Sequence, residues 1–83
     1  MTVEEARALL SRTLREVAPE ADVAAADPDG PLQDELGLDS LDFIRIVDLV
    51  HDTTGIDIPE RDFPRLSTLR SFVAYLASEG RVP

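Results

Sequence analysis

The chain has no cysteine, no lysine and only one histidine among its 83 residues. Without cysteine, the protein has no disulfide, no thiolate metal site and no thiol chemistry of its own. With neither lysine nor cysteine, and with His51 alone, few side chains remain that could activate a nucleophile. We therefore expect a protein that is not an enzyme, and we assign no function to His51.

Long apolar runs are missing as well, and no segment is long enough to span a bilayer. Residues 1–5 are acidic and lack the basic and apolar pattern of a signal peptide. The expected location is the cytoplasm. Because linkers, repeats and low-complexity tracts are also absent, we expect one free-standing domain over residues 1–83, present as a monomer.

Positive charge is scarce, because eight basic residues, all of them arginine, stand against 17 acidic residues and give a net charge of −9. Such a surface repels nucleic acid and anionic membranes, and it attracts partners that carry basic patches. The acids show no calcium-loop spacing, so we predict no metal site. We predict that salt or magnesium stabilises the fold, because either one relieves repulsion among the acids.

Helical periodicity, in contrast, occurs in three segments of the chain. In the first, an apolar stripe lies within residues 3–17, with Thr2 as the N-cap and Glu5 completing a capping box. The third is predicted to begin at an N-cap on Ser67 and to end at Gly80.

The second periodic segment predicts a helix over residues 40–53, followed by Gly55 as a C-terminal signal. At 100° per residue, the apolar side chains and the charged side chains gather on opposite faces. Leu41 falls on the charged face, beside Ser40, where a docking enzyme could contact it. The predicted core face is Phe43, Ile46, Val47 and Val50, and the charged face is Asp42, Arg45, Asp48 and Asp52.

Residues 18–39 lack this periodicity, and we interpret them as a long first loop. A short helical turn is expected within residues 22–26. Leu32, Leu36 and Leu38 are interpreted as anchors that hold the loop against the core. The breaks in the pattern are Pro19, Pro28, Gly30 and Pro31.

After Gly55 we expect an extended segment and then a short helix over residues 60–63, which Pro64 stops. The predicted fold is therefore all-α: a bundle of three main helices plus one short helix, with a long first loop.

Ser40 lies at the start of the second predicted helix, between Asp39 and Asp42 and next to Leu41. An isolated Asp-Ser pair at this position is usually a cap, worth about 1 kcal/mol. No base lies near Ser40 in the sequence, which argues against a hydrolase. The tight local context and the acids downstream favour a hydroxyl that another enzyme reaches and modifies.

The run Leu36-Gly37-Leu38-Asp39-Ser40-Leu41-Asp42 resembles the prosthetic-group attachment motif of acyl carrier proteins. The similarity covers nearly the whole chain and includes the long first loop and the segment 55–59. It implies that a phosphopantetheinyl transferase attaches 4′-phosphopantetheine to Ser40, beside Asp39 and Leu41. That arm would supply the only thiol, which carries acyl groups as thioesters in fatty-acid, polyketide or related biosynthesis.

The same resemblance implies that the second helix is read by acyl-loading and acyl-transferring enzymes with basic docking patches. The expected contact residues are Leu41, Asp42, Arg45, Asp48 and Asp52. Arg45 departs from the acidic pattern of the family. It could pair with Asp42 or Asp48, each three residues away, or it could alter the choice of partner.

Two alternatives remain open at this point. One is an aminoacyl or peptidyl carrier, although such carriers usually have glycine or histidine where this chain has Asp39. The other is a small acidic interaction module without a prosthetic group, in which Ser40 is only a cap.

Overall fold

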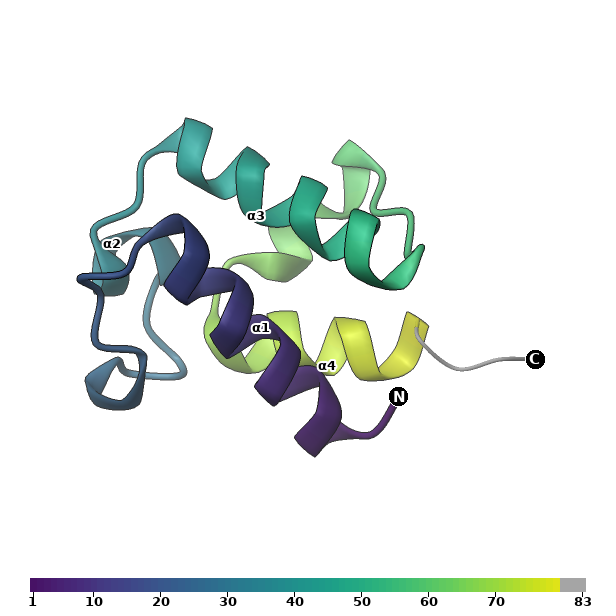
Figure 1. The fold of residues 1–83 in the computed structure, drawn as a ribbon, viewed down its shortest axis with the longest axis horizontal. Coiled ribbons are helices and arrows are strands. Elements are labelled where there is room, and N and C mark those ends of the chain that lie inside the picture. Colours follow the sequence, from purple (N-terminus) through teal and green to yellow (C-terminus); the bar gives the residue numbers. More distant parts are fainter. Residues whose placement is uncertain (80–83) are drawn as a thin grey trace.

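The computed structural model describes residues 1–79, and in these residues every regular element is a helix, which confirms the all-α class (Figure 1). The three main helices are α1, α3 and α4, as the periodicity predicted. In chain order the elements are α1 (Val3–Val17), the 3₁₀ helix η1 (Val23–Ala25), α2 (Leu32–Leu36), α3 (Ser40–Thr54), the 3₁₀ helix η2 (Glu60–Leu66) and α4 (Leu69–Glu79).

Helix α1 begins with the predicted capping box. The backbone N–H of Glu5 donates to the Thr2 hydroxyl at 3.1 Å, and the N–H of Thr2 donates to the Glu5 carboxylate at 2.8 Å. Thr13 is buried, yet its hydroxyl is satisfied, because it donates to the Leu9 carbonyl at 2.9 Å. The helix thus buries one face without leaving a polar group unpaired.

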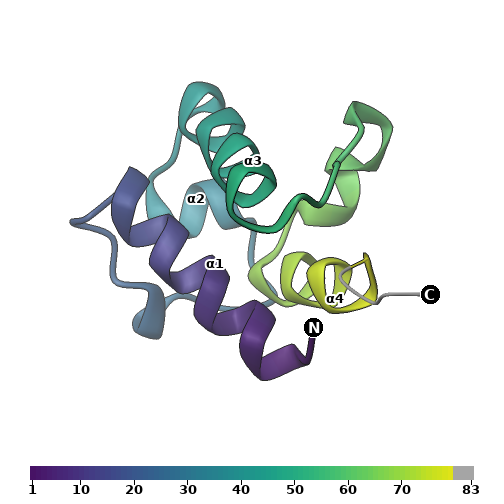
Figure 2. The ribbon, with the colours of Figure 1, turned by 45° about the vertical axis from the view of Figure 1, so that its right-hand side comes forward.

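The core lies between α1, α3 and α4, with α3 and α4 each packed against α1 (Figures 1 and 2). Leucines from α1 interdigitate there with branched and aromatic side chains from the other two helices. The fully buried members include Leu10 and Leu14 from α1, Ile46 and Val50 from α3, and Phe72 and Leu76 from α4.

The long first loop predicted for residues 18–39 is only partly a loop, since it contains α2 as well as the expected turn η1. Helix α2 is held by tertiary contacts, because the N–H of Leu32 donates to the Ser67 carbonyl at 2.7 Å and both Leu32 and Leu36 are buried. Five residues are too few to show helical periodicity, so the sequence pattern missed this element. The anchor role predicted for Leu32, Leu36 and Leu38 agrees with their burial.

Two predicted helix boundaries near the C-terminal end were wrong. Pro64 does not stop the short helix, because η2 is a 3₁₀ helix that continues through it to Leu66. The cap of α4 is Thr68 rather than Ser67, since the Thr68 hydroxyl accepts the N–H of Ser71 at 3.0 Å. The hydroxyl of Ser71 accepts the N–H of Thr68 in return at 3.2 Å, so the two residues cap each other. The predicted end at Gly80 lies outside the described residues.

Helix α3 ends as predicted at Gly55, whose φ of 75° is in the left-handed region that glycine adopts freely. Its N–H donates to the His51 carbonyl at 2.7 Å. The exposed ring of His51 has Nδ1 at 3.1 Å from the Ile56 carbonyl oxygen. The segment between Gly55 and η2 contains neither helix nor strand, and Pro59 at its end has extended backbone angles.

Candidate functional site

The entry into α3 is fixed by Gly37 and Asp39. Gly37 ends α2 with a φ of 67°, and the following N–H, that of Leu38, donates to the Gln33 carbonyl at 2.8 Å. Asp39 is the N-cap of α3 and forms a capping box with Asp42. The N–H of Asp42 donates to Asp39 Oδ1 at 2.8 Å, and the N–H of Asp39 donates to Asp42 Oδ2 at 3.3 Å. The chain therefore leaves α2 and starts α3 within a short, fixed turn.

Ser40 is the first residue of α3 and is exposed. The capping oxygen belongs to Asp39, so the Ser40 hydroxyl is not used as a cap. It forms no hydrogen bond with any residue in the described part of the chain. The hydroxyl therefore lies in solvent at the positive end of a helix, where free N–H groups favour an anion.

The two neighbouring carboxylates act against an anion at this point. Both Asp39 and Asp42 lie within the first turn and carry the same sign of charge as a phosphate. The helix terminus and a surface charge each contribute about 1 kcal/mol or less at an exposed position, so neither effect dominates. The geometry of the turn, rather than its net electrostatic attraction, distinguishes this serine.

One outer face of α3 collects most of the predicted partner residues. Leu41 is 74% exposed, and Arg45, Asp48 and Asp52 are exposed along the same stripe of the helix. Asp42 is only partly exposed, because its carboxylate turns back toward the N–H of Asp39. The sequence correctly placed Leu41 on the charged face.

The predicted pairing of Arg45 with Asp42 or Asp48 is wrong, because Arg45 forms no ion pair with any described residue. The capping box accounts for Asp42, whose carboxylate already accepts the N–H of Asp39. The guanidinium of Arg45 thus stands unpaired between acidic neighbours on the exposed face of α3.

A groove of about 610 Å³ opens beside Ser40, between α3, η2 and the beginning of α2. Phe43 forms part of its floor and contacts Phe63 of η2 edge to face, with ring centroids 5.4 Å apart. Ile44 also lines the groove and is 42% exposed. Helical periodicity does not identify Ile44 as a site residue, because its position on α3 lies between the core face and the charged face. Only the tertiary placement of η2 gives it a neighbour.

The outer wall of this groove, η2, is attached to α4 through Tyr75. The Tyr75 hydroxyl donates to Asp62 at 2.8 Å, and the Arg65 guanidinium lies 4.7 Å from the centre of the Tyr75 ring. Burial, with the nearby Asp62 carboxylate as a second cause, raises the pKa of Tyr75 to about 12. The neutral phenol therefore remains bonded to Asp62 at physiological pH.

Neither a candidate metal cluster nor a candidate membrane-spanning helix is found among the described residues. Among residues 1–79 no group of three or more histidine, cysteine, aspartate or glutamate side chains could hold a metal ion. Over the same residues, the helices are too short or too polar to cross a membrane.

Comparison with known proteins identifies the class to which this chain belongs. The family described as Phosphopantetheine attachment site matches residues 5–76 of the chain. The chain is also 35% identical to the acyl carrier protein of Streptomyces coelicolor over 81 residues, which cover 98% of this chain and 84% of that protein. The chain belongs to the acyl carrier protein family.

Two further acyl carrier proteins match about half of the chain. The protein from Bdellovibrio bacteriovorus is 33% identical over 48 residues, which cover 58% of this chain and 62% of that protein. The protein from Lactobacillus johnsonii is 39% identical over 46 residues, which cover 55% of this chain and 58% of that protein.

Proposed function

We propose that the protein is a carrier and not an enzyme, and that Ser40 is the residue to which 4′-phosphopantetheine is attached. The observation that carries this proposal is the exposed, unbonded hydroxyl at the first position of α3, within the residues that match the family. A single domain over residues 1–83 would carry this function.

The division of roles between Asp39 and Ser40 supports a carrier over an acidic interaction module. In such a module Ser40 would serve as the helix cap, but Asp39 already accepts the N–H of Asp42. A serine that neither caps the helix nor packs in the core is available to a modifying enzyme. Asp39 and Leu41 flank the hydroxyl and would orient the transferase on it.

The residues present fit the prosthetic group at its point of attachment. Ser40 offers a free hydroxyl, and the terminus of α3 offers N–H groups near the phosphodiester. The bound arm would supply the thiol that the chain lacks, for acyl groups held as thioesters. Asp39, in the place where aminoacyl and peptidyl carriers usually have glycine or histidine, favours acyl cargo of fatty-acid, polyketide or related biosynthesis.

The outer face of α3 is the proposed docking surface for partner enzymes with basic patches. It combines one exposed apolar side chain with charges that remain in solvent, which suits small and transient interfaces. Arg45 interrupts the acidic stripe, and its unpaired guanidinium would select partners that present a carboxylate at this point. The proposed contacts are Leu41, Asp42, Arg45, Asp48 and Asp52.

Intact-mass measurement tests the attachment site. The protein is incubated with coenzyme A, magnesium and a promiscuous phosphopantetheinyl transferase. A gain of one phosphopantetheinyl group, absent from the Ser40→Ala variant, is expected. A wild-type chain that gains nothing would indicate the interaction module, and a modified Ser40→Ala variant would place the attachment at another hydroxyl.

A further inference from the structure

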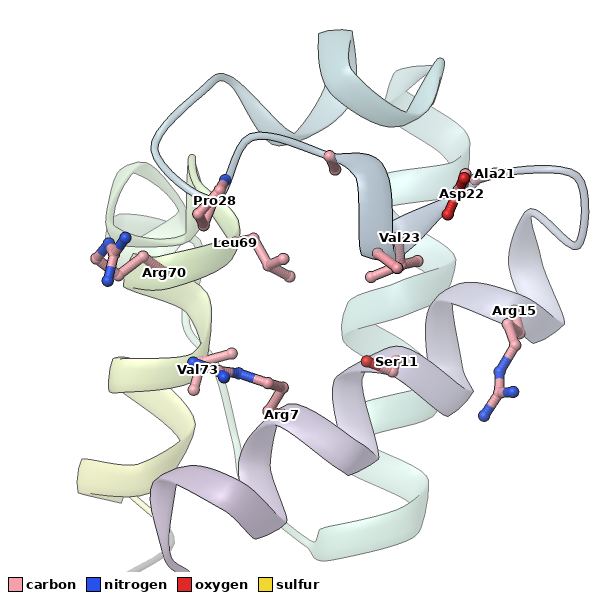
Figure 3. Close-up of a pocket in the computed structure, with 12 residues that line it drawn as sticks. Arg7, Ser11, Arg15, Ala21, Asp22, Val23, Pro28, Leu69, Arg70 and Val73 are labelled. Atoms are coloured by element: carbon pink, nitrogen blue, oxygen red, sulfur yellow. The ribbon is translucent and has the colours of Figure 1, made fainter.

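A second groove lies on the side of the bundle formed by α1, the beginning of α4 and the segment between α1 and α2 (Figure 3). Its volume is about 800 Å³, and it shares no lining residue with the groove beside Ser40. Grooves of about 300–1,000 Å³ are the usual size for small-molecule sites. The proposed carrier function makes no use of this groove.

The inner surface of the second groove is apolar and built largely from small side chains. Val23 of η1 and Leu69 of α4 face the hollow, with Val73 one turn further along α4 (Figure 3). Three alanines before, within and after η1 have side chains too short to fill the space between the helices. These alanines are Ala21, Ala24 and Ala26.

Helix α1 contributes a polar edge to the same groove. Arg7, Ser11 and Arg15 follow each other at four-residue intervals, so all three lie on one face of the helix. In Figure 3 the Arg7 side chain points across the groove toward Val73. The side chains of Arg7 and Arg15 form no hydrogen bond or ion pair with another residue of the described range 1–79.

The other charged groups at the groove are already engaged. Arg70 donates to both carboxylate oxygens of Asp29, from Nε at 2.6 Å and from a terminal nitrogen at 3.3 Å. Asp22 accepts the N–H of Ala25 at 3.3 Å as the cap of η1. The unpaired guanidinium of Arg7 therefore stands beside an apolar hollow, on a chain whose net charge is −9, whereas the Arg15 side chain points away from the hollow (Figure 3).

This arrangement matches a ligand with an apolar body and a negative head. We propose that the second groove binds a small amphiphilic carboxylate, whose aliphatic chain lies over Val23, Leu69 and Val73. Arg7 holds the carboxylate by charge-assisted hydrogen bonds, and Arg15, two turns further along α1, adds a more distant positive charge. A neutral chain of equal length lacks the ionic contact, and a cationic one is repelled.

Sodium decanoate, at concentrations below its critical micelle concentration, is a suitable probe for NMR titration of the isotope-labelled full chain. Backbone amide signals are expected to shift around Ser11, Val23 and Leu69. Decanol should bind about tenfold more weakly than decanoate, since a hydrogen bond to a charged group is worth about 1.5–3 kcal/mol. The decyltrimethylammonium cation should bind more weakly still.

Matched variants assign the binding to the two free arginines. Replacing both by glutamine, in Arg7→Gln/Arg15→Gln, should weaken decanoate binding by about tenfold. Arg12→Gln removes the same charge from α1 at a position that does not line the groove, and it should leave the affinity unchanged. Ala24→Leu fills the hollow without any change of charge and should also weaken binding.

Several results would overturn the proposal. One is equal binding of decanoate and decanol. Another is an unchanged decanoate affinity in Arg7→Gln/Arg15→Gln or in Ala24→Leu. A third is that decanoate shifts no backbone amide signal. Shifts confined to Ile44 and Phe63 would place the ligand in the groove beside Ser40 instead. Decanoate should bind Ser40→Ala as it binds the wild type, so failure of the carrier proposal and failure of this one can be told apart.

Discussion

At the start of α3, the adjacent residues Asp39 and Ser40 have different roles. The sequence alone does not show which of the two caps the helix. Asp39 and Ser40 are both residue types that cap helices well. The structure assigns the capping oxygen to Asp39, through the 2.8 Å bond from the N–H of Asp42. The Ser40 hydroxyl thereby forms no hydrogen bond with a described residue, which is what a modification site requires.

Removal of the capping group should cost stability, whereas removal of the serine hydroxyl should not. We expect Asp39→Ala to lower the free energy of unfolding by about 1 kcal/mol, because the N–H of Asp42 loses its acceptor. Ser40→Ala should change it by only a few tenths of a kcal/mol. Urea unfolding of the two variants measures the difference. A larger loss for Ser40→Ala would identify Ser40 as the cap and remove the main structural support for Ser40 as the attachment site.

Tyr75 gives the fold a pH dependence in the alkaline range. Its pKa is raised to about 12 in the folded protein, from an ordinary value of 10.0. The stability that comes from the buried neutral phenol is therefore fully present below pH 10 and is lost as the pH rises toward 12. Because Tyr75 is the only tyrosine, the absorbance of tyrosinate reports this titration directly.

The Tyr75→Phe variant is the matched control for this titration. It should be less stable than the wild type at neutral pH by about 1 kcal/mol, through loss of the bond to Asp62. The difference between the two proteins should shrink between pH 10 and 12. A constant difference across this range would mean that the phenol does not control the effect.

At the scale of elements, short connections set the position of α3. Gly37 lies between two helices that are separated by only three residues, and its φ of 67° turns the chain from α2 into α3. A Cβ added there would meet no atom within 4 Å, so only the backbone conformation demands glycine.

A substitution series at Gly37 separates backbone strain from crowding. Gly37→Ala should lower the free energy of unfolding by about 1 kcal/mol, since alanine resists the left-handed conformation. Gly37→Asn should cost less, because asparagine tolerates this region better. Thermal or urea unfolding measures both. Equal losses in the two variants would argue that the conformation at this turn is not the cause.

The outer face of α3 should control the rate at which a transferase with a basic docking patch modifies the protein. We expect Asp48→Asn to lower kcat/KM and Arg45→Gln to raise it, by up to about fivefold, because an exposed ion pair is worth about 0.2–1 kcal/mol. Both effects should fade at high salt. Asp57→Asn, an exposed change outside α3, is the control. An effect of Asp57→Asn as large as that of Asp48→Asn would show that only net charge matters.

The main electrostatic property of the molecule is its net charge of −9 on 83 residues. Only one ion pair, Arg70 with Asp29, is formed among the described residues, and both side chains are largely exposed. Hydrogen bonding to Arg70 holds the pKa of Asp29 below its usual value. Most of the acids therefore remain unpaired, and their mutual repulsion works against the compact state.

Salt should raise the melting temperature through screening of this repulsion. Relief of about 1 kcal/mol would raise Tm by about 4–8 °C in a domain of this size. Sodium chloride and magnesium chloride should act alike at equal ionic strength, because no cluster for a metal was found in residues 1–79. A Tm that is independent of salt would contradict the prediction, and a larger effect of magnesium would indicate a specific site.

The amino-acid sequence was sufficient to predict the three main helices, the capping box at Thr2, the end of α3 at Gly55 and the exposure of Leu41. Each of these features follows from residues close together in the chain, through helical periodicity or a local hydrogen bond. It also indicated Ser40 as the residue of interest.

Features that depend on residues distant in sequence emerge only in the folded chain. Helix α2 is held by the 2.7 Å bond from Leu32 to Ser67, and Ile44 acquires its groove only because η2 lies beside α3. The groove that places Arg7 and Val73 at one hollow joins residues from α1 and α4. Contacts of this kind leave no periodic pattern in the sequence. They arise from the packing of one element against another, and the conformation of a single segment does not determine them.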